Sequence, residues 1–206
     1  MRHYNNKALR SFFGARTGGQ DRPQSINTPQ FLIDAILYMW PRIELDPCTN
    51  VWSKVPAEHK VVAKELLDQV YFVSSQKYPI TKNGGLGIDW PEYTYANVPY
   101  RDLKLWLVKP VPTMEHLILC PVRTHRKWFC EAIGQASICC FLKPFAFDGH
   151  KQCYPTPLVM AYWGCRLDKF IEAFASYGMI GTLRAIEYVL QPLEQSLTES
   201  QLTLQL

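Results

Sequence analysis

Four consecutive residues, Asn97-Val98-Pro99-Tyr100, combine a side-chain amide, a restrained carbonyl and an aromatic ring. Asn97 offers an acceptor oxygen, and the backbone carbonyl of Val98 offers a second, held in place because Pro99 restricts the preceding residue and fixes the turn. Two acceptors aimed at the hydrogens of an exocyclic amine leave its nitrogen able to attack a methyl donor. The aromatic ring of Tyr100 offers a flat surface on which a nucleobase that has been flipped out of a nucleic-acid helix can stack. These four residues are therefore the candidate catalytic residues for methyl transfer to an amine.

The neighbouring segments indicate where this tetrapeptide lies. Residues 93–96 are aromatic or β-branched apart from one alanine, which is typical of a buried strand. Residues 101–108 place apolar side chains at helical spacing. Residues 97–100 therefore form the turn that leaves a strand, where α/β sheets bind their ligands.

The rest of the chain alternates between the two kinds of segment. We expect further helices at 30–40, 57–73, 125–135 and 167–178, and further strands at 43–48, 116–120, 137–142 and 157–164. Thr28 as N-cap and Pro29 as first helical residue mark the start of the first helix. Three glycines exclude regular structure from residues 82–91. Alternating strands and helices predict an α/β domain over residues 25–187 with a mostly parallel sheet.

Composition and charge limit the class of protein. No segment approaches the roughly 20 apolar residues that cross a bilayer, and the N-terminus lacks a signal-peptide shape, so we expect a cytoplasmic protein (in the host cytoplasm if a phage encodes it).

The seven cysteines include no CxxC pair, so we expect no metal site. The net charge of +4 equals the excess within residues 1–24, five basic residues against one acid. This flexible arm suits phosphate contacts or is an ordinary solvated terminus, and residues 188–206 form a polar tail.

Five blocks of sequence occur in an informative order. They are Thr28-Pro29, Leu45-Asp46-Pro47-Cys48, Gly85-Leu86-Gly87-Ile88-Asp89-Trp90, Asn97-Val98-Pro99-Tyr100, and Pro121-Val122-Arg123 with Trp128-Phe129. Together they resemble the phage-type DNA N-6-adenine methyltransferase family over about residues 27 to 163. Val98 stands where the amino-methyltransferase signature has its first proline, and residues 143–145 lack the Gly-Arg pair expected in that stretch.

The resemblance implies a Rossmann-like S-adenosylmethionine-dependent methyltransferase fold that methylates the N6 amine of adenine in double-stranded DNA. It implies S-adenosyl-L-methionine as the cofactor. The implied cofactor-binding residues are Thr28, Pro29, Asp46, Pro47, Cys48 and Asp89. The residues expected to face DNA phosphate are Arg101, Lys104 and Arg123.

Two other functions use the same sequence features. A catalytically impaired protein that kept the fold would bind nucleic acid without reacting. Methylation of an RNA adenine or of a glutamine amide needs the same arrangement of acceptors around an amine. The basic arm favours nucleic acid over protein as the partner.

Overall fold

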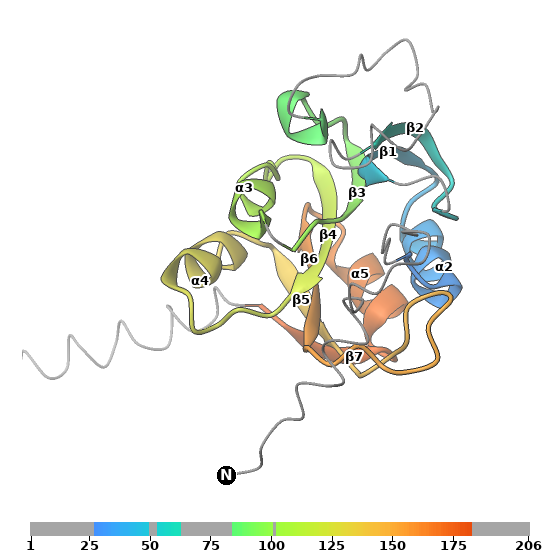
Figure 1. Cartoon of the computed structure of the whole chain (residues 1–206). Coiled ribbons are helices and arrows are strands. Elements are labelled where there is room, and N and C mark those ends of the chain that lie inside the picture. The colour runs from blue at the N-terminus through green and yellow to red at the C-terminus, as the bar shows by residue number, and fades with distance from the viewer. Residues whose placement is uncertain (1–26, 50–52, 63–83, 101, 183–206) are drawn as a thin grey trace, which may run out of the picture.

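The computed structural model describes residues 27–49, 53–62, 84–100 and 102–182 (Figure 1). They form one seven-stranded sheet in the order β2-β1-β3-β4-β6-β5-β7. The pairings β2–β1, β1–β3 and β3–β4 are parallel, whereas β4–β6, β6–β5 and β5–β7 are antiparallel. The sheet is therefore mixed, with β2, β1, β3, β4 and β5 running in one direction and β6 and β7 in the other. Most strands share one direction, as predicted. The arm at 1–24 and the tail at 188–206 lie outside the described residues.

The boundaries of the elements are as follows. The strands are β1 (Ile43–Thr49), β2 (Ala57–Val62), β3 (Tyr93–Asn97), β4 (Glu115–Pro121), β5 (Ile138–Leu142), β6 (Leu158–Trp163) and β7 (Gly178–Gly181). The helices are α2 (Gln30–Met39), α3 (Leu103–Leu107), α4 (Lys127–Ile133), α5 (Leu167–Phe174) and the 3₁₀ helix η2 (Gly84–Gly87). None of these helices, in the part of the chain that is described, has both the length and the apolar character needed to cross a membrane.

Helices cover both faces of the sheet, with α2 and α5 on one face and α3 and α4 on the other (Figure 1). Successive side chains of a strand point to opposite faces. On β3, Tyr93 and Tyr95 pack with residues of α2 and α5, whereas Ala96 packs with residues of α3 and α4. Because of this alternation, the side chains of β3 contribute to two separate apolar clusters, one on each face of the sheet. Asn97 lies two residues after Tyr95 and therefore on the same face, the one that α2 covers.

The helix predicted over residues 57–73 is wrong at its start, because residues 57–62 form β2. Ala57 is the parallel partner of Ile43, and His59 is the partner of Leu45. Val61 is buried in the apolar cluster on the α3 side of the sheet. Pairing with β1 outweighs the helix propensity of this segment, and residues 63–73 lie outside the described part.

Three smaller differences have local causes. Thr28 does not cap α2; the cap residue is Pro29, whose carbonyl accepts from the N–H groups of Leu32 and Ile33 at 3.1 and 3.3 Å. Residues 84–87, expected to be irregular, form one 3₁₀ turn. The sequence also missed β7, whose glycines weaken a strand pattern. Gly178 is needed there because a Cβ would lie 2.2 Å from the carbonyl oxygen of Phe141.

Candidate functional site

The order of the strands reverses between β1 and β3. From β1 the chain goes to β2 on one side, and then returns to β3 on the other side of β1. In open α/β sheets, ligands bind at such a reversal, outside the carboxyl ends of the strands. The carboxyl ends here are residues 46–49 of β1 and Asn97 of β3. Two of the sequence blocks singled out above therefore meet at this point.

Thr28, Tyr95 and Asn97 form a hydrogen-bonded group, the Asn97 group. The hydroxyl oxygens of Thr28 and Tyr95 lie 2.8 Å apart. The amide nitrogen of Asn97 donates a longer hydrogen bond, of 3.5 Å, to the Thr28 hydroxyl. This contact places the nitrogen of the amide beside Thr28. The role of the Asn97 amide oxygen as an acceptor stays a prediction.

Cys48 connects the end of β1 to the Asn97 group. Its thiol donates to the backbone carbonyl of Asn97, with 3.2 Å between sulfur and oxygen. Burial, followed by the nearby charge of Asp46, raises the pKa of Cys48 well above its usual value. The protonated thiol is the form that donates, and Cys48 thereby holds the end of β1 against the backbone of Asn97.

Asp46 stabilises the turn after β1. Its side chain is buried, and Oδ1 accepts from the backbone N–H of Cys48 at 3.3 Å. Burial raises the pKa of Asp46 to about 6, and hydrogen bonds from Cys48, Thr49 and Ser53 oppose that rise. The carboxylate therefore faces its own turn and holds the strand end that adjoins Asn97.

The block at residues 85–90 packs directly on β1. A Cβ on Gly85 would lie 1.9 Å from the carbonyl oxygen of Pro47, so only glycine allows this approach. The indole N–H of the buried Trp90 donates to the carbonyl oxygen of Gly85 at 3.0 Å. Asp89, by contrast, is exposed, and among the described residues no hydrogen bond or ion pair joins it to the Asn97 group. Its predicted contact with a cofactor has no support from this arrangement.

The rest of the tetrapeptide is held by the core. Val98 is 2% exposed, and its N–H donates to the carbonyl of Leu119 at 3.4 Å, so the backbone of Val98 is fixed. Pro99 and Tyr100 are half-buried. The ring of Tyr100 meets that of Tyr154 edge-on, with 5.7 Å between their centres.

The hydroxyl of Tyr100 is buried and has no hydrogen-bond partner within the described ranges. Burial raises the pKa of Tyr100 well above its usual value. The ring is therefore more enclosed than the open stacking surface that the sequence predicted.

The three basic residues expected to face DNA phosphate differ from one another in their exposure to solvent. Arg101 lies outside the described residues, and Lys104 is exposed on α3. Arg123 follows β4 and is half-buried. Burial raises the pKa of Tyr154 to about 12, and the positive charge of Arg123 opposes this rise. Arg123 therefore adjoins the tyrosines beside the candidate site.

Sequence reasoning missed Tyr95 and Tyr154. The sequence did contain a signal for Tyr95: it lies two residues before Asn97 on the same strand, so the two side chains lie on the same face of the sheet. Tyr154 had none, since it lies in a loop and reaches Tyr100 only through tertiary packing. Within the described ranges, no three His, Cys, Asp or Glu side chains come together as metal ligands. No protein-family model, curated protein or solved structure matches this chain.

Proposed function

We propose that this protein is a cytoplasmic S-adenosylmethionine-dependent methyltransferase that acts on the N6 amine of adenine in double-stranded DNA. The observation that supports this most is the meeting of three distant segments at one point of the sheet. Thr28 before α2 and Cys48 on β1 both hydrogen-bond to Asn97 on β3 there. These segments carry three of the five blocks on which the resemblance to the phage-type family rests.

The residues at this point fit the proposed cofactor. α2 has no acidic residue in its first turn. The partial positive charge at its N-terminus therefore suits a carboxylate such as that of the methionine part of S-adenosylmethionine. Thr28 and Pro29 precede that turn directly, and the Asn97 group lies beside it. Thr28, Pro29 and the end of β1 would hold the cofactor, which supplies an electrophilic methyl group.

The chain's own residues would orient the amine. The nitrogen of an adenine amine is conjugated with the ring and is already uncharged at neutral pH, so it needs acceptors more than a strong base. Asn97 Oδ1 would accept one hydrogen of the amine, and the carbonyl of Val98 would accept the other. Pro99 keeps that carbonyl from turning, and the Tyr100 ring would contact the adenine face. Fixing these dipoles before the reaction lowers the reorganisation needed in the transition state.

The direct test has two measurements on the whole chain. Calorimetric titration with S-adenosylmethionine should give saturable binding. Incubation with DNA of mixed sequence, followed by mapping of methylated adenines site by site, should give N6-methyladenine in a restricted sequence context. An absence of binding at millimolar cofactor would overturn the proposal. Methylation of RNA in place of DNA would show that the substrate of the proposed methyltransferase is RNA.

A second candidate function is nucleic-acid binding without reaction. One observation favours it: the Tyr100 ring packs edge-on against Tyr154 and its hydroxyl is enclosed, so the ring offers a flipped base less surface than an exposed tyrosine would. Such a protein would bind DNA with a strong dependence on salt and would show neither cofactor binding nor methylation. The two measurements above separate the candidates.

A further inference from the structure

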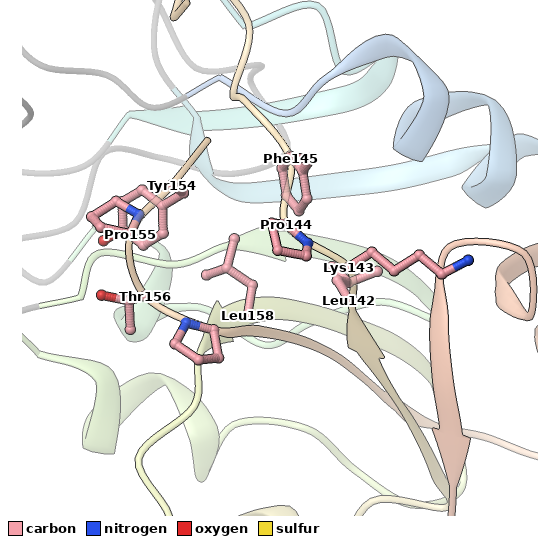
Figure 2. Close-up of a pocket in the computed structure, with 9 residues that line it drawn as sticks. Leu142, Lys143, Pro144, Phe145, Tyr154, Pro155, Thr156 and Leu158 are labelled. Atoms are coloured by element: carbon pink, nitrogen blue, oxygen red, sulfur yellow. The ribbon is translucent and has the colours of Figure 1, made fainter. Parts of the chain in front are cut away.

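A pocket of about 280 Å³ opens between the end of β5 and the start of β6 (Figure 2). Its lining residues are Leu142, Lys143, Pro144, Phe145, Tyr154, Pro155, Thr156, Pro157 and Leu158. β4 is parallel to β3, and β6 is antiparallel to both β4 and β5. The end of β5 and the start of β6 therefore lie at the same edge of the sheet as Asn97.

The pocket adjoins the tetrapeptide without including it. Neither Asn97 nor Tyr100 lines the pocket, but Tyr154 both lines it and packs edge-on against Tyr100. A molecule in the pocket would thus be one aromatic side chain away from Tyr100. It would be a neighbour of the reacting group rather than the group itself.

The lining chemistry suits a flat, largely apolar ring. The lining comprises three prolines and two aromatic rings, and it includes no acidic side chain. Figure 2 shows the Lys143 side chain extending away from Tyr154, and its ammonium group donates to the carbonyl of Ser176 at 3.0 Å, so this charge does not point into the pocket. A nucleobase has the flat shape and the apolar faces that this lining fits.

The pocket wall is held by contacts to other elements. The ring of Phe145 meets that of Phe31 on α2 edge-on at 5.5 Å, and the N–H of Tyr154 donates to the carbonyl of Phe145 at 2.8 Å. Thr156 hydrogen-bonds the Tyr154 hydroxyl through its side chain. Residues 143–145 of this wall are also the stretch in which the chain departs from the family it resembles. The pocket is therefore a place where this chain can differ in the DNA that it selects.

We propose that this pocket binds the unstacked base of a nucleotide that flanks the methylated adenine, and that it contributes to the choice of DNA sequence. The flanking role rests on the proposed function. Binding of a nucleotide by the pocket does not depend on catalysis, so the two can be tested separately. Shape and stacking on Tyr154 and Phe145 would select the base, because the lining offers few hydrogen-bonding groups.

The test is a titration of the whole chain with dAMP, dCMP, dGMP and dTMP, followed by amide chemical shifts. We expect at least one of the four to perturb the amides of the lining residues that have an N–H, which are Leu142, Lys143, Phe145, Tyr154, Thr156 and Leu158. Thr156→Phe, which fills the pocket, should weaken this binding by about tenfold or more. Thr156→Ser, the matched control, keeps the hydroxyl and should stay within about twofold of the parent. If Thr156→Phe fails to fold in thermal unfolding, Pro155→Tyr at the exposed rim is the second variant.

The outcomes separate the two proposals. If no nucleotide perturbs these amides, or if the filled pocket binds as well as the parent, the pocket proposal is wrong. If nucleotides bind here but S-adenosylmethionine binds nowhere, the proposed function fails and the nucleotide site stands. If the parent methylates DNA and Thr156→Phe does so with an unchanged flanking-base preference, the pocket has no role in selection.

Discussion

The hydroxyl groups of Thr28 and Tyr95 lie 2.8 Å apart, although 67 residues separate them along the chain. The same Thr28 oxygen accepts from the amide of Asn97. One hydroxyl at the start of α2 therefore positions two side chains of β3. Both Thr28 and Tyr95 are buried, so water cannot replace either partner.

Thr28→Val should lower the free energy of unfolding by about 1–3 kcal/mol, because the buried Tyr95 hydroxyl loses its partner while the shape of residue 28 is kept. It should also lower methylation activity, since the Asn97 amide is no longer oriented. Urea unfolding and initial rates measure the two effects. Thr28→Ser retains the hydroxyl and serves as control. Equal stability and rate for Val and Ser would show that this hydroxyl positions nothing.

Asn97→Ala should reduce turnover far more than cofactor affinity. Loss of one preoriented hydrogen-bonding group at a reacting centre typically costs about 10²–10³ in rate. The measurements are kcat for methylation and the Kd for S-adenosylmethionine. Asn97→Asp keeps an acceptor oxygen and should retain more activity than alanine. An alanine variant as active as the parent would contradict the mechanism.

Val98→Pro should lower the free energy of unfolding but leave the methylation activity nearly unchanged. Proline removes the N–H that donates to the carbonyl of Leu119, a loss of about 0.5–1.5 kcal/mol. The carbonyl proposed as second acceptor stays, so the methylation rate should remain within a few-fold of the parent. Thermal unfolding and initial rates test this. A large gain in rate from a nearly inactive parent would instead identify the natural chain as a disabled methyltransferase.

Tyr100→Phe should raise the free energy of unfolding by about 1 kcal/mol. The buried hydroxyl of Tyr100 lacks a hydrogen-bond partner within the described residues, and phenylalanine removes this unpaired group while keeping the ring against Tyr154. Chemical denaturation measures the change. Tyr100→Ala is the contrasting variant, because it also removes the packing and should destabilise. A clear loss of stability in Tyr100→Phe would mean that the hydroxyl does have a partner.

His116 should make stability fall in mild acid. Its Nδ1 accepts from the N–H of Val111 at 3.1 Å, so Nε2 carries the hydrogen that it shares with the carbonyl of Pro91 at 3.0 Å. Burial lowers the pKa of His116 from 6.5 to about 4. Between these pH values the unfolded chain binds a proton that the folded chain does not. The free energy of unfolding should therefore drop, by about 3 kcal/mol in all, as the pH falls from 6.5 to 4.

The measurement for His116 is urea unfolding across this pH range, with His116→Gln as the variant that cannot titrate. Asp46 acts in the opposite direction, since a raised pKa lets the folded chain take up a proton first as the pH falls. Asp46 is present in both proteins, so the difference between them isolates His116. Parallel pH curves for parent and variant would rule out this role.

Local sequence was sufficient to place the tetrapeptide at the end of a strand. Strands β1, β3, β4, β5 and β6 and helices α2, α3 and α4 begin and end within two residues of the segments expected from spacing. Helix α5 begins at the expected residue but ends four residues early, at Phe174, because Gly178 already belongs to β7. Spacing predicts these elements because each buries one face or a short apolar run against a neighbour. The clustering of Asp46–Cys48 with Asn97 followed in turn from the rule that parallel strands end at one edge.

Tertiary structure decided the features that depend on distant partners. Residues 57–62 became a strand because β1 offers them a parallel edge, which no local pattern reveals. The Thr28 hydroxyl binds Tyr95 and Asn97 instead of capping α2, and Tyr154 closes over Tyr100 to form one wall of a pocket. In each case a polar group or a strand edge pairs with a partner that is distant in the sequence and that folding brings close. An unpaired polar group in the core costs more free energy than the local conformational preference of the segment contributes.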